Sequence, residues 1–268
     1  MSSHVFDQAI ALSAQPDGSW LGQTNAAYAN MVGPFGGLTA AQALNAVLQH
    51  PQRLGEPVSL TVNFAAALAD GSFSVQAHPA RTNRSTQHWT IEMQQQGQTV
   101  LTATAFTALR RDTWSASDEA MPIVQRPGDL PRADLSGRVE WVKRYDMRVV
   151  HGALPLAWDG RESDSLSQLW IRDDPPRPLD FTSLTALADV FFPRLWRRRA
   201  TLTPIGTVSM TVYFHADAPK LRETGTDYLL GQARAQAFRN GYFDQTAQLW
   251  NEAGELLVTT HQIVYYKE

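Results

Sequence analysis

Runs in which apolar and polar residues alternate fill most of both halves of the chain, and this period of two predicts strands. In the run 58–67, for example, Leu60, Val62 and Phe64 share one face, and the polar residues between them share the other. The other predicted strands cover residues 4–12, 19–23, 72–81, 87–95, 99–110, 139–151, 165–171, 207–215, 227–238, 242–251 and 255–266. Asp70-Gly71 and Gln96-Gly97-Gln98 are typical of hairpin turns between strands.

Two stretches show helical spacing instead. Apolar residues recur every three or four positions over 38–48 and again over 181–192, so a helix is predicted in each half. Asp180 can cap the second helix at its N-terminus, and Pro193 would end it.

A six-residue segment occurs twice. Ser59-Leu60-Thr61-Val62-Asn63-Phe64 returns 150 residues later as Ser209-Met210-Thr211-Val212-Tyr213-Phe214. Each copy follows a predicted helix and precedes further strands, which indicates two copies of one domain, residues 1–111 and 139–268. The Pro-, Gly- and Ser-containing stretch 112–138 is predicted to link them. One helix followed by an antiparallel meander, twice, predicts an α+β double hotdog.

The composition narrows the classes of partner. The 268 residues carry a formal net charge of −3, and no stretch is apolar enough to span a membrane. The chain has no cysteine and no signal-peptide pattern at its start. We therefore expect a cytoplasmic protein that binds neither nucleic acid nor membranes, with a homodimer as the predicted assembly because sheet edges often pair.

The two halves differ in residues that can carry chemistry. Residues 21–54 contain no carboxylate, but the second predicted helix carries Asp189 among apolar neighbours. The pair Gly36-Gly37 precedes the first helix and has no counterpart before the second. A carboxylate in an apolar setting is either functional or part of a structural ion pair, and the glycines either admit a substrate carbonyl or form a tight turn. Together they suggest one composite site.

Several further residues are candidates. Thr207 and Gln262 lie on predicted strands and could hold a water or a carboxylate, although Thr207 shares the polar phase of Ser209 and Thr211. Arg81, Arg84 and Arg197 could contact nucleotide phosphates, or could be solvated surface charges. The seven histidines show no metal-ligand spacing and no G-x-S-x-G motif is present, so no metal, no cofactor and no serine nucleophile are predicted.

The sequence resembles the double-hotdog, thioesterase II-like acyl-CoA thioesterases. The resemblance rests on Gly33-Pro34-Phe35-Gly36-Gly37-Leu38 before an alanine-rich helix, on the repeated strand and on the ending Tyr213-Phe214-His215. It implies a hydrolase that cleaves acyl-CoA to a free acid and CoA. It also implies that Asp189, Thr207 and Gln262 position the water. With this activity, the free N–H groups at Gly36 and Gly37 are expected to bind the thioester carbonyl.

Two other functions stay open at this stage. A hotdog protein that binds acyl-CoA without catalysis would show the same residue types. A hydratase or dehydratase acting on acyl-CoA usually needs a His and an Asp near the first helix, and residues 20–49 contain neither.

Overall fold

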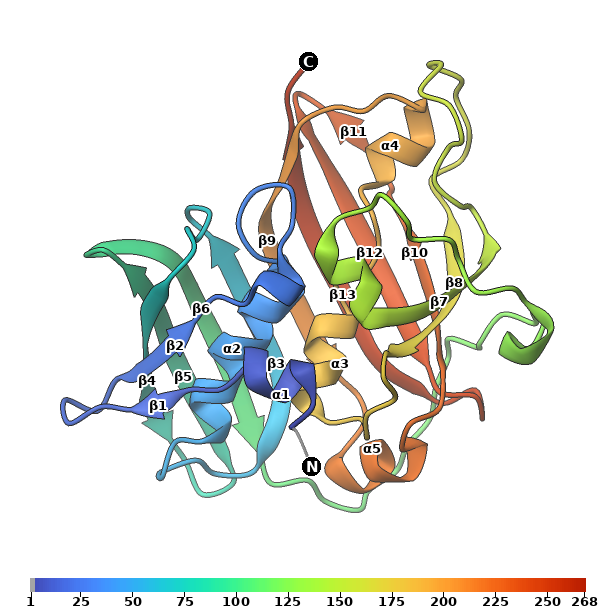
Figure 1. The fold of residues 1–268 in the computed structure, drawn as a ribbon. Helices are drawn as coiled ribbons and strands as arrows, with labels where there is room; N and C mark the ends of the chain where they lie inside the picture. Colours follow the sequence, from blue (N-terminus) through green and yellow to red (C-terminus); the bar gives the residue numbers. More distant parts are fainter. Residues whose placement is uncertain (1–2) are drawn as a thin grey trace.

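A single antiparallel sheet runs through the molecule in the computed structural model, which describes residues 3–268 (Figure 1). Its 13 strands follow the order β1-β2-β4-β5-β6-β3-β9-β13-β12-β10-β8-β7, and β11 pairs with β12. The strands are β1 (Ser13–Ala14), β2 (Trp20–Gln23), β3 (Glu56–Phe64), β4 (Ser72–Thr82), β5 (Thr86–Gln95), β6 (Gln98–Ala108), β7 (Tyr145–His151), β8 (Ser167–Asp173), β9 (Ile205–Phe214), β10 (Leu229–Arg234), β11 (Phe238–Arg239), β12 (Tyr242–Trp250) and β13 (Leu256–Tyr266).

Two helices, α2 (Gly36–Leu48) and α3 (Phe181–Leu187), lie together against the sheet at the centre of the molecule (Figure 1). All residues from Gly37 to Val47 and all of α3 are buried, as a helix enclosed by a sheet requires. The predicted α+β double-hotdog arrangement is confirmed. The remaining helical elements are α1 (Val5–Ala9), α4 (Arg194–Arg199), α5 (Ala218–Thr224) and the short 3₁₀ helices η1 (Ala26–Tyr28), η2 (Pro127–Asp129) and η3 (Glu140–Arg144).

The repeated segments meet at the middle of the sheet. β3 pairs antiparallel with β9 so that Thr61 lies opposite Thr211, its equivalent in the second copy. Their hydroxyl oxygens are 3.0 Å apart. A repeat whose equivalent residues pair with each other has a local twofold axis at that point. The two halves therefore share one continuous sheet and place their helices side by side.

One of the two predicted hairpin turns is confirmed, whereas the hairpin predicted at Asp70-Gly71 is wrong because β3 and β4 do not pair with each other. Gln96 and Gly97 both have positive φ, 52° and 74°, between β5 and β6. Positive φ at both central residues is the geometry of a type I′ hairpin turn, so the turn predicted there is confirmed.

Several predicted elements differ from the structure. The predicted strand 139–151 begins only at Tyr145, because residues 140–144 form η3, and the predicted strand 227–238 is regular only over β10. Residues 4–12 do not form a strand but contain α1, whose first turn is capped by the His4 ring, and which buries Phe6 and Ala9. The second helix does not reach residue 192, because α3 ends at Leu187 and the chain turns before α4 begins after Pro193. α5 was not predicted; Asp217 caps it and Pro219 lies in its first turn.

The connection between the halves has little regular structure. Residues 109–126 contain neither helix nor strand, and η2 follows them. The Trp170 indole nevertheless donates a hydrogen bond to the carbonyl of Gln125 at 2.8 Å, so the connection is fixed against β8. The domain boundaries at 111 and 138 stay a prediction.

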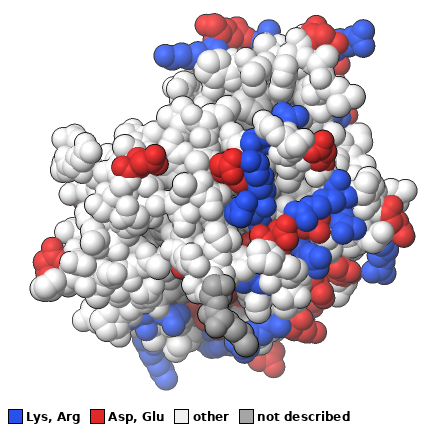
Figure 2. All heavy atoms as spheres, viewed as in Figure 1, with Lys and Arg blue, Asp and Glu red and all other residues white. Residues whose placement is uncertain are grey.

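Charges of both signs lie close together on the face drawn in Figure 2, mainly over its right-hand part and along its upper and lower edges. The ion pairs of the structure, such as Arg132 with Asp174 and Lys143 with Glu140, agree with this pattern. None of the helices within residues 3–268 has the length and apolar character needed to cross a membrane.

One ion-pair network joins the N-terminal helix to α3. Arg177 donates to Asp7 Oδ1 at 2.7 and 2.9 Å and to Asp180, the α3 N-cap residue, at 2.5 Å. Its side chain is only 11% exposed. We expect Arg177→Met to lower the free energy of unfolding by about 2 kcal/mol, because it leaves two carboxylates without their partner. Urea unfolding at pH 7 measures this.

Arg132→Met is the matched control for that substitution. Arg132 pairs with Asp174, but its side chain is 48% exposed, so its loss is expected to cost less than about 1 kcal/mol. Equal losses for the two variants would contradict a structural role for the Arg177 network.

Candidate active site

The Asp189 carboxylate lies between the end of one central helix and the start of the other. The Asp189 N–H bonds to the Ala186 carbonyl at 3.1 Å, which forms the turn that follows α3. This turn directs the side chain to the N-terminus of α2. A Cβ atom added to Gly36 would lie 2.9 Å from Asp189 Oδ2. Only glycine leaves this space, so Gly36 is the residue that lets the carboxylate approach α2.

The second glycine permits the contact between the helices. A Cβ atom at Gly37 would lie 2.7 Å from the Ala186 carbonyl oxygen and 2.6 Å from the Phe35 ring. These distances are shorter than van der Waals contact, so a larger residue would separate α2 from α3. The structure thus brings Gly36, Gly37 and Asp189 together from the two halves of the chain.

Gln262 completes the contacts of the carboxylate. Its side-chain amide donates a hydrogen bond to Asp189 Oδ1 at 2.7 Å and lies 3.5 Å from the Met210 sulfur. Burial raises the pKa of the Asp189 carboxyl to about 7, while the hydrogen bond from Gln262 and the Gly37 N–H oppose that rise. A carboxyl with this pKa can accept a proton near neutral pH and release it again.

Thr207 reaches the same face of the sheet through a β-bulge. Ser209 pairs with Ile263, but the next pair joins Thr207 to Val264, so β9 has one extra residue there. Residues directly opposite each other in an antiparallel pair point to one face. Val264 and Gln262 are both buried on the face that carries the helices. The phase predicted for Thr207 is therefore wrong, and the bulge moves Thr207 from the outer to the inner face.

The backbone N–H groups at the start of α2 lie beside the Asp189 carboxylate, and that of Gly37 interacts with it. Phe35 is the N-cap residue and has no side-chain oxygen to bond them, so the first amides of the helix have no intrahelical acceptor. These amides and the helix dipole favour negative charge at this point. The arrangement can stabilise an oxyanion next to a carboxylate that handles protons.

An aromatic cover over the start of α2 was not predicted as part of the site. The Phe35 and Trp141 rings stack at 4.1 Å between centroids, and Tyr145 packs edge-on against both. The Trp141 N–H also bonds to the Ala29 carbonyl at 3.2 Å. Trp141 lies in η3, where the sequence pattern predicted part of the strand 139–151.

A buried arginine holds the segment that follows Asp189. Arg194 is fully buried; its Nε donates to the Phe192 carbonyl and to Gln245 Oε1, each at 3.0 Å. Gln245 lies directly opposite Gln262 across the β12–β13 pair. These contacts fix the chain that follows Asp189 against β12, and the sequence gave no pairing signal for them.

The three arginines proposed for phosphate binding lie elsewhere. Arg81 and Arg84 are exposed near the β4–β5 hairpin, where Arg81 bonds to Asn83. The hairpin lies beside Ala108 of β6, which pairs with Glu56 at the start of β3. Gly36 lies near Phe64, at the opposite end of β3, so the hairpin and the candidate site are at different ends of this strand. Arg197 donates to the Leu166 carbonyl at 2.8 Å and to Asp164 at 3.2 Å. The structure does not bring these arginines to Asp189, and their phosphate contacts stay a prediction.

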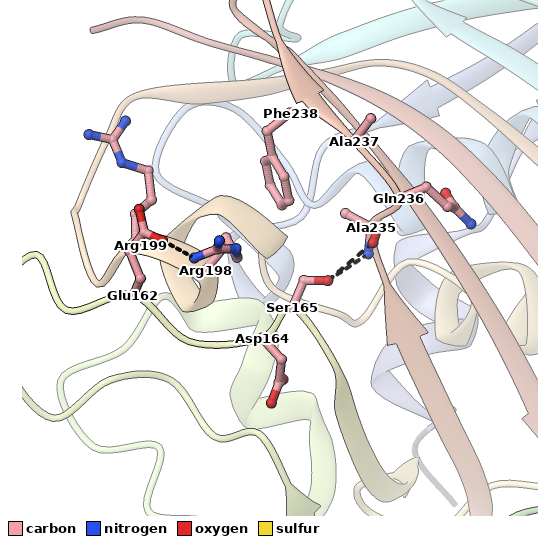
Figure 3. Close-up of a pocket in the computed structure, with 9 residues that line it drawn as sticks. All are labelled: Glu162, Asp164, Ser165, Arg198, Arg199, Ala235, Gln236, Ala237 and Phe238. Atoms are coloured by element: carbon pink, nitrogen blue, oxygen red, sulfur yellow. Dashed lines mark hydrogen bonds and ion pairs between the residues drawn. The ribbon is translucent and has the colours of Figure 1, made fainter.

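A cavity of about 550 Å³ opens beside α4, away from the carboxylate (Figure 3). Its lining includes Arg198 and Arg199, but Arg198 is paired with Glu162 at 2.7 Å and Arg199 with Glu268. It contains neither Asp189 nor Gln262. No group of three or more His, Asp or Glu side chains within residues 3–268 has the geometry of a metal site.

Sequence models of two protein domains match most of the chain. The acyl-CoA thioesterase N-terminal domain matches residues 25–108, and the acyl-CoA thioesterase C-terminal domain matches residues 124–266. No curated protein sequence matches the chain.

Several solved structures share the fold. A conserved hot dog protein of unknown function from Alicyclobacillus acidocaldarius has 47% sequence identity and a TM-score of 0.94, with 100% of this chain and 99% of that chain covered. A putative thioesterase II from Thermobifida fusca has 16% identity, a TM-score of 0.82 and coverage of 100% and 99%. An acyl-CoA thioesterase II from Mycobacterium marinum has 18% identity, a TM-score of 0.77 and coverage of 98% of both chains.

Proposed function

The chain belongs to the acyl-CoA thioesterase family and is an acyl-CoA thioester hydrolase, and from this premise we propose that Asp189, Gln262 and Thr207 activate the hydrolytic water. In this proposal Asp189 is the general base. Gln262 and Thr207 hold the water and the carboxylate, and the N–H of Gly37 binds the carbonyl oxygen of the thioester.

The reaction proceeds through a tetrahedral intermediate. The water oxygen attacks the thioester carbonyl carbon and gives a proton to the Asp189 carboxylate. The carbonyl oxygen becomes an oxyanion, which the α2 amides stabilise. When the oxyanion re-forms the carbonyl, the carbon–sulfur bond breaks and the proton returns to the leaving sulfur. The products are the free acid and the CoA thiol, and Asp189 is again ionised.

The proposal depends most on one observation, the 2.7 Å hydrogen bond from Gln262 to the Asp189 carboxylate at the start of α2. Each half of the chain supplies a different part of this site, because α2 comes from the first half, and Asp189 and Gln262 come from the second. A structural ion pair would be an alternative role for Asp189, but its hydrogen-bond partner is a neutral amide.

The pH dependence of free-thiol release from a panel of acyl-CoAs tests the proposal. The base must be ionised, and burial raises the Asp189 pKa to about 7. We therefore expect kcat/KM to fall about tenfold for each pH unit below 7 and to level off above it. Thiol release by a chromogenic thiol reagent between pH 5.5 and 8.5 measures the profile.

Two outcomes would count against the proposal. A profile that stays level down to pH 5 would show that no group with this raised pKa limits the reaction. Saturable binding of an acyl-CoA with no thiol release from any member of the panel would instead indicate a binding protein.

A further inference from the structure

A second group of buried polar atoms lies near Asp189 and has no role in the proposed mechanism. Tyr28 and Tyr145 are fully buried, and Asp173 is 3% exposed. The two phenol hydroxyls and Asp173 Oδ1 have no hydrogen-bond partner among residues 3–268. Buried polar groups are almost always hydrogen-bonded, so three such oxygens in one region require an explanation.

The three side chains belong to one cluster. Tyr145 on β7 lies directly opposite Asp173 on β8, so both side chains project from the same face of the sheet. The Ser183 hydroxyl donates to Asp173 Oδ2 at 2.6 Å, which leaves Oδ1 as the oxygen that lacks a partner. Burial is the main cause that raises the pKa of the Tyr28 phenol. The second cause is the charge of Asp173, which therefore lies within electrostatic range of Tyr28.

The cluster adjoins the start of α2. The Phe35 N–H bonds to the Tyr28 carbonyl at 2.9 Å, and the Phe35 ring packs edge-on against Tyr145 at 6.3 Å. The pKa of Tyr145 lies well above its usual value, first because of burial and further because of the charges of Tyr28, Asp173 and Asp189. The cluster is therefore next to the glycines and the carboxylate of the proposed active site.

The chemistry of the three oxygens restricts what can bind there. Each phenol can donate one hydrogen bond, and an ionised Asp173 can only accept. A hydroxyl group can accept from a phenol and donate to Asp173 Oδ1 at the same time. A hydrocarbon leaves all three oxygens without a partner.

We propose that Tyr28, Tyr145 and Asp173 bind a hydroxyl group on the acyl chain of the substrate. The enzyme then selects hydroxyacyl-CoAs over the unsubstituted acyl-CoAs of the same length. This inference rests on the proposed function, because it takes the thioester carbonyl to lie at Gly37 and Asp189.

The test compares kcat/KM for butyryl-CoA with kcat/KM for 2-, 3- and 4-hydroxybutyryl-CoA, whose hydroxyls lie at different distances from the carbonyl. We expect the wild type to prefer one isomer by at least about tenfold, since a site built for a hydroxyl discriminates strongly against its absence. Tyr28→Phe and Tyr145→Phe each remove one donor and are expected to reduce that ratio about tenfold. Tyr228→Phe is the matched control, because its hydroxyl is bound to Asp146 instead, and its ratio should equal that of the wild type.

Calorimetry can also measure the Kd of butyryl-CoA and of each hydroxybutyryl-CoA for Asp189→Asn, which requires neither turnover nor the tyrosine variants. We expect this variant to bind the preferred hydroxybutyryl-CoA more tightly than butyryl-CoA. A wild-type ratio near one for all isomers, or a ratio that both tyrosine variants leave unchanged, would overturn the inference and assign the oxygens to buried water. Failure of the proposed function looks different, because Asp189→Asn would then hydrolyse butyryl-CoA as fast as the wild type.

Discussion

Asp189→Asn is expected to lower kcat for acyl-CoA hydrolysis by about 10³-fold while leaving the Kd for acyl-CoA within about threefold of the wild type. The amide has the shape of the carboxyl but cannot take the proton of the attacking water. In the wild type the Gln262 amide donates to Asp189 Oδ1, and the side-chain oxygen of the Asn variant can accept the same hydrogen bond. Thiol-release kinetics and calorimetric binding measure the two quantities separately.

The stability of this variant gives an internal check on its fold. Burial raises the Asp189 pKa from 3.8 to about 7, so the ionised carboxylate destabilises the folded state. That penalty is complete above pH 7 and disappears as the pH falls toward 3.8. Asp189→Asn should therefore unfold at a higher temperature than the wild type at pH 8, with a smaller gain at pH 5.

Asp244→Asn serves as the matched control for the loss of activity. Asp244 precedes Gln245 on β12, so its side chain points away from the face that carries Asp189 and Gln262. We expect its kcat to match that of the wild type. Wild-type kcat in Asp189→Asn, or an equal loss in Asp244→Asn, would remove the basis for the general-base assignment.

The second large effect is expected from Gly37→Ala. The added methyl group would lie 2.7 Å from the Ala186 carbonyl oxygen, and this backbone atom cannot move without shifting α3. Overpacking of this kind costs about 1–3 kcal/mol, against which alanine regains up to about 1 kcal/mol of helix propensity. Asp189 follows Ala186 by three residues, so a displaced α3 moves the base, and we expect kcat/KM to fall about 10²-fold. Urea unfolding and thiol-release kinetics measure the two effects.

Gly128→Ala is the control for this substitution. A Cβ atom at Gly128 would meet no heavy atom within 4 Å, so both stability and kcat/KM should stay near the wild-type values. If Gly37→Ala were as stable and as active as Gly128→Ala, the close contact between α2 and α3 would have no importance for catalysis.

Much of the architecture follows from local patterns. The alternation in Leu60, Val62 and Phe64, the turn at Gln96-Gly97 and the helical spacing over 38–48 all have local physical causes, and the structure confirms each of them. The repeat of residues 59–64 at 209–214 was enough to predict two equivalent halves. The contrast between Gly36-Gly37 and Asp189 also gave the two parts of the candidate site without any coordinates.

Other features were decided by contacts between distant residues. α1 forms where a strand was predicted, because Phe6 and Ala9 are buried in the core and the His4 ring caps the helix. The chain leaves α3 at Leu187, although the apolar spacing continues to Phe191. Periodicity reports which face of an element is apolar, but the end of an element depends on what packs against it.

The sequence by itself determined the double-hotdog plan and the residue types of the site, because these depend on spacing, turn chemistry and repetition within short segments. Only the tertiary structure decided that Thr207 faces inward, since the bulge is a property of the pairing between β9 and β13. It likewise decided that Tyr145 and Asp173 lie opposite each other, because the pairing of β7 with β8 joins residues that are far apart in the chain. A one-residue slip in register changes the face of every following side chain, and no local pattern records that slip.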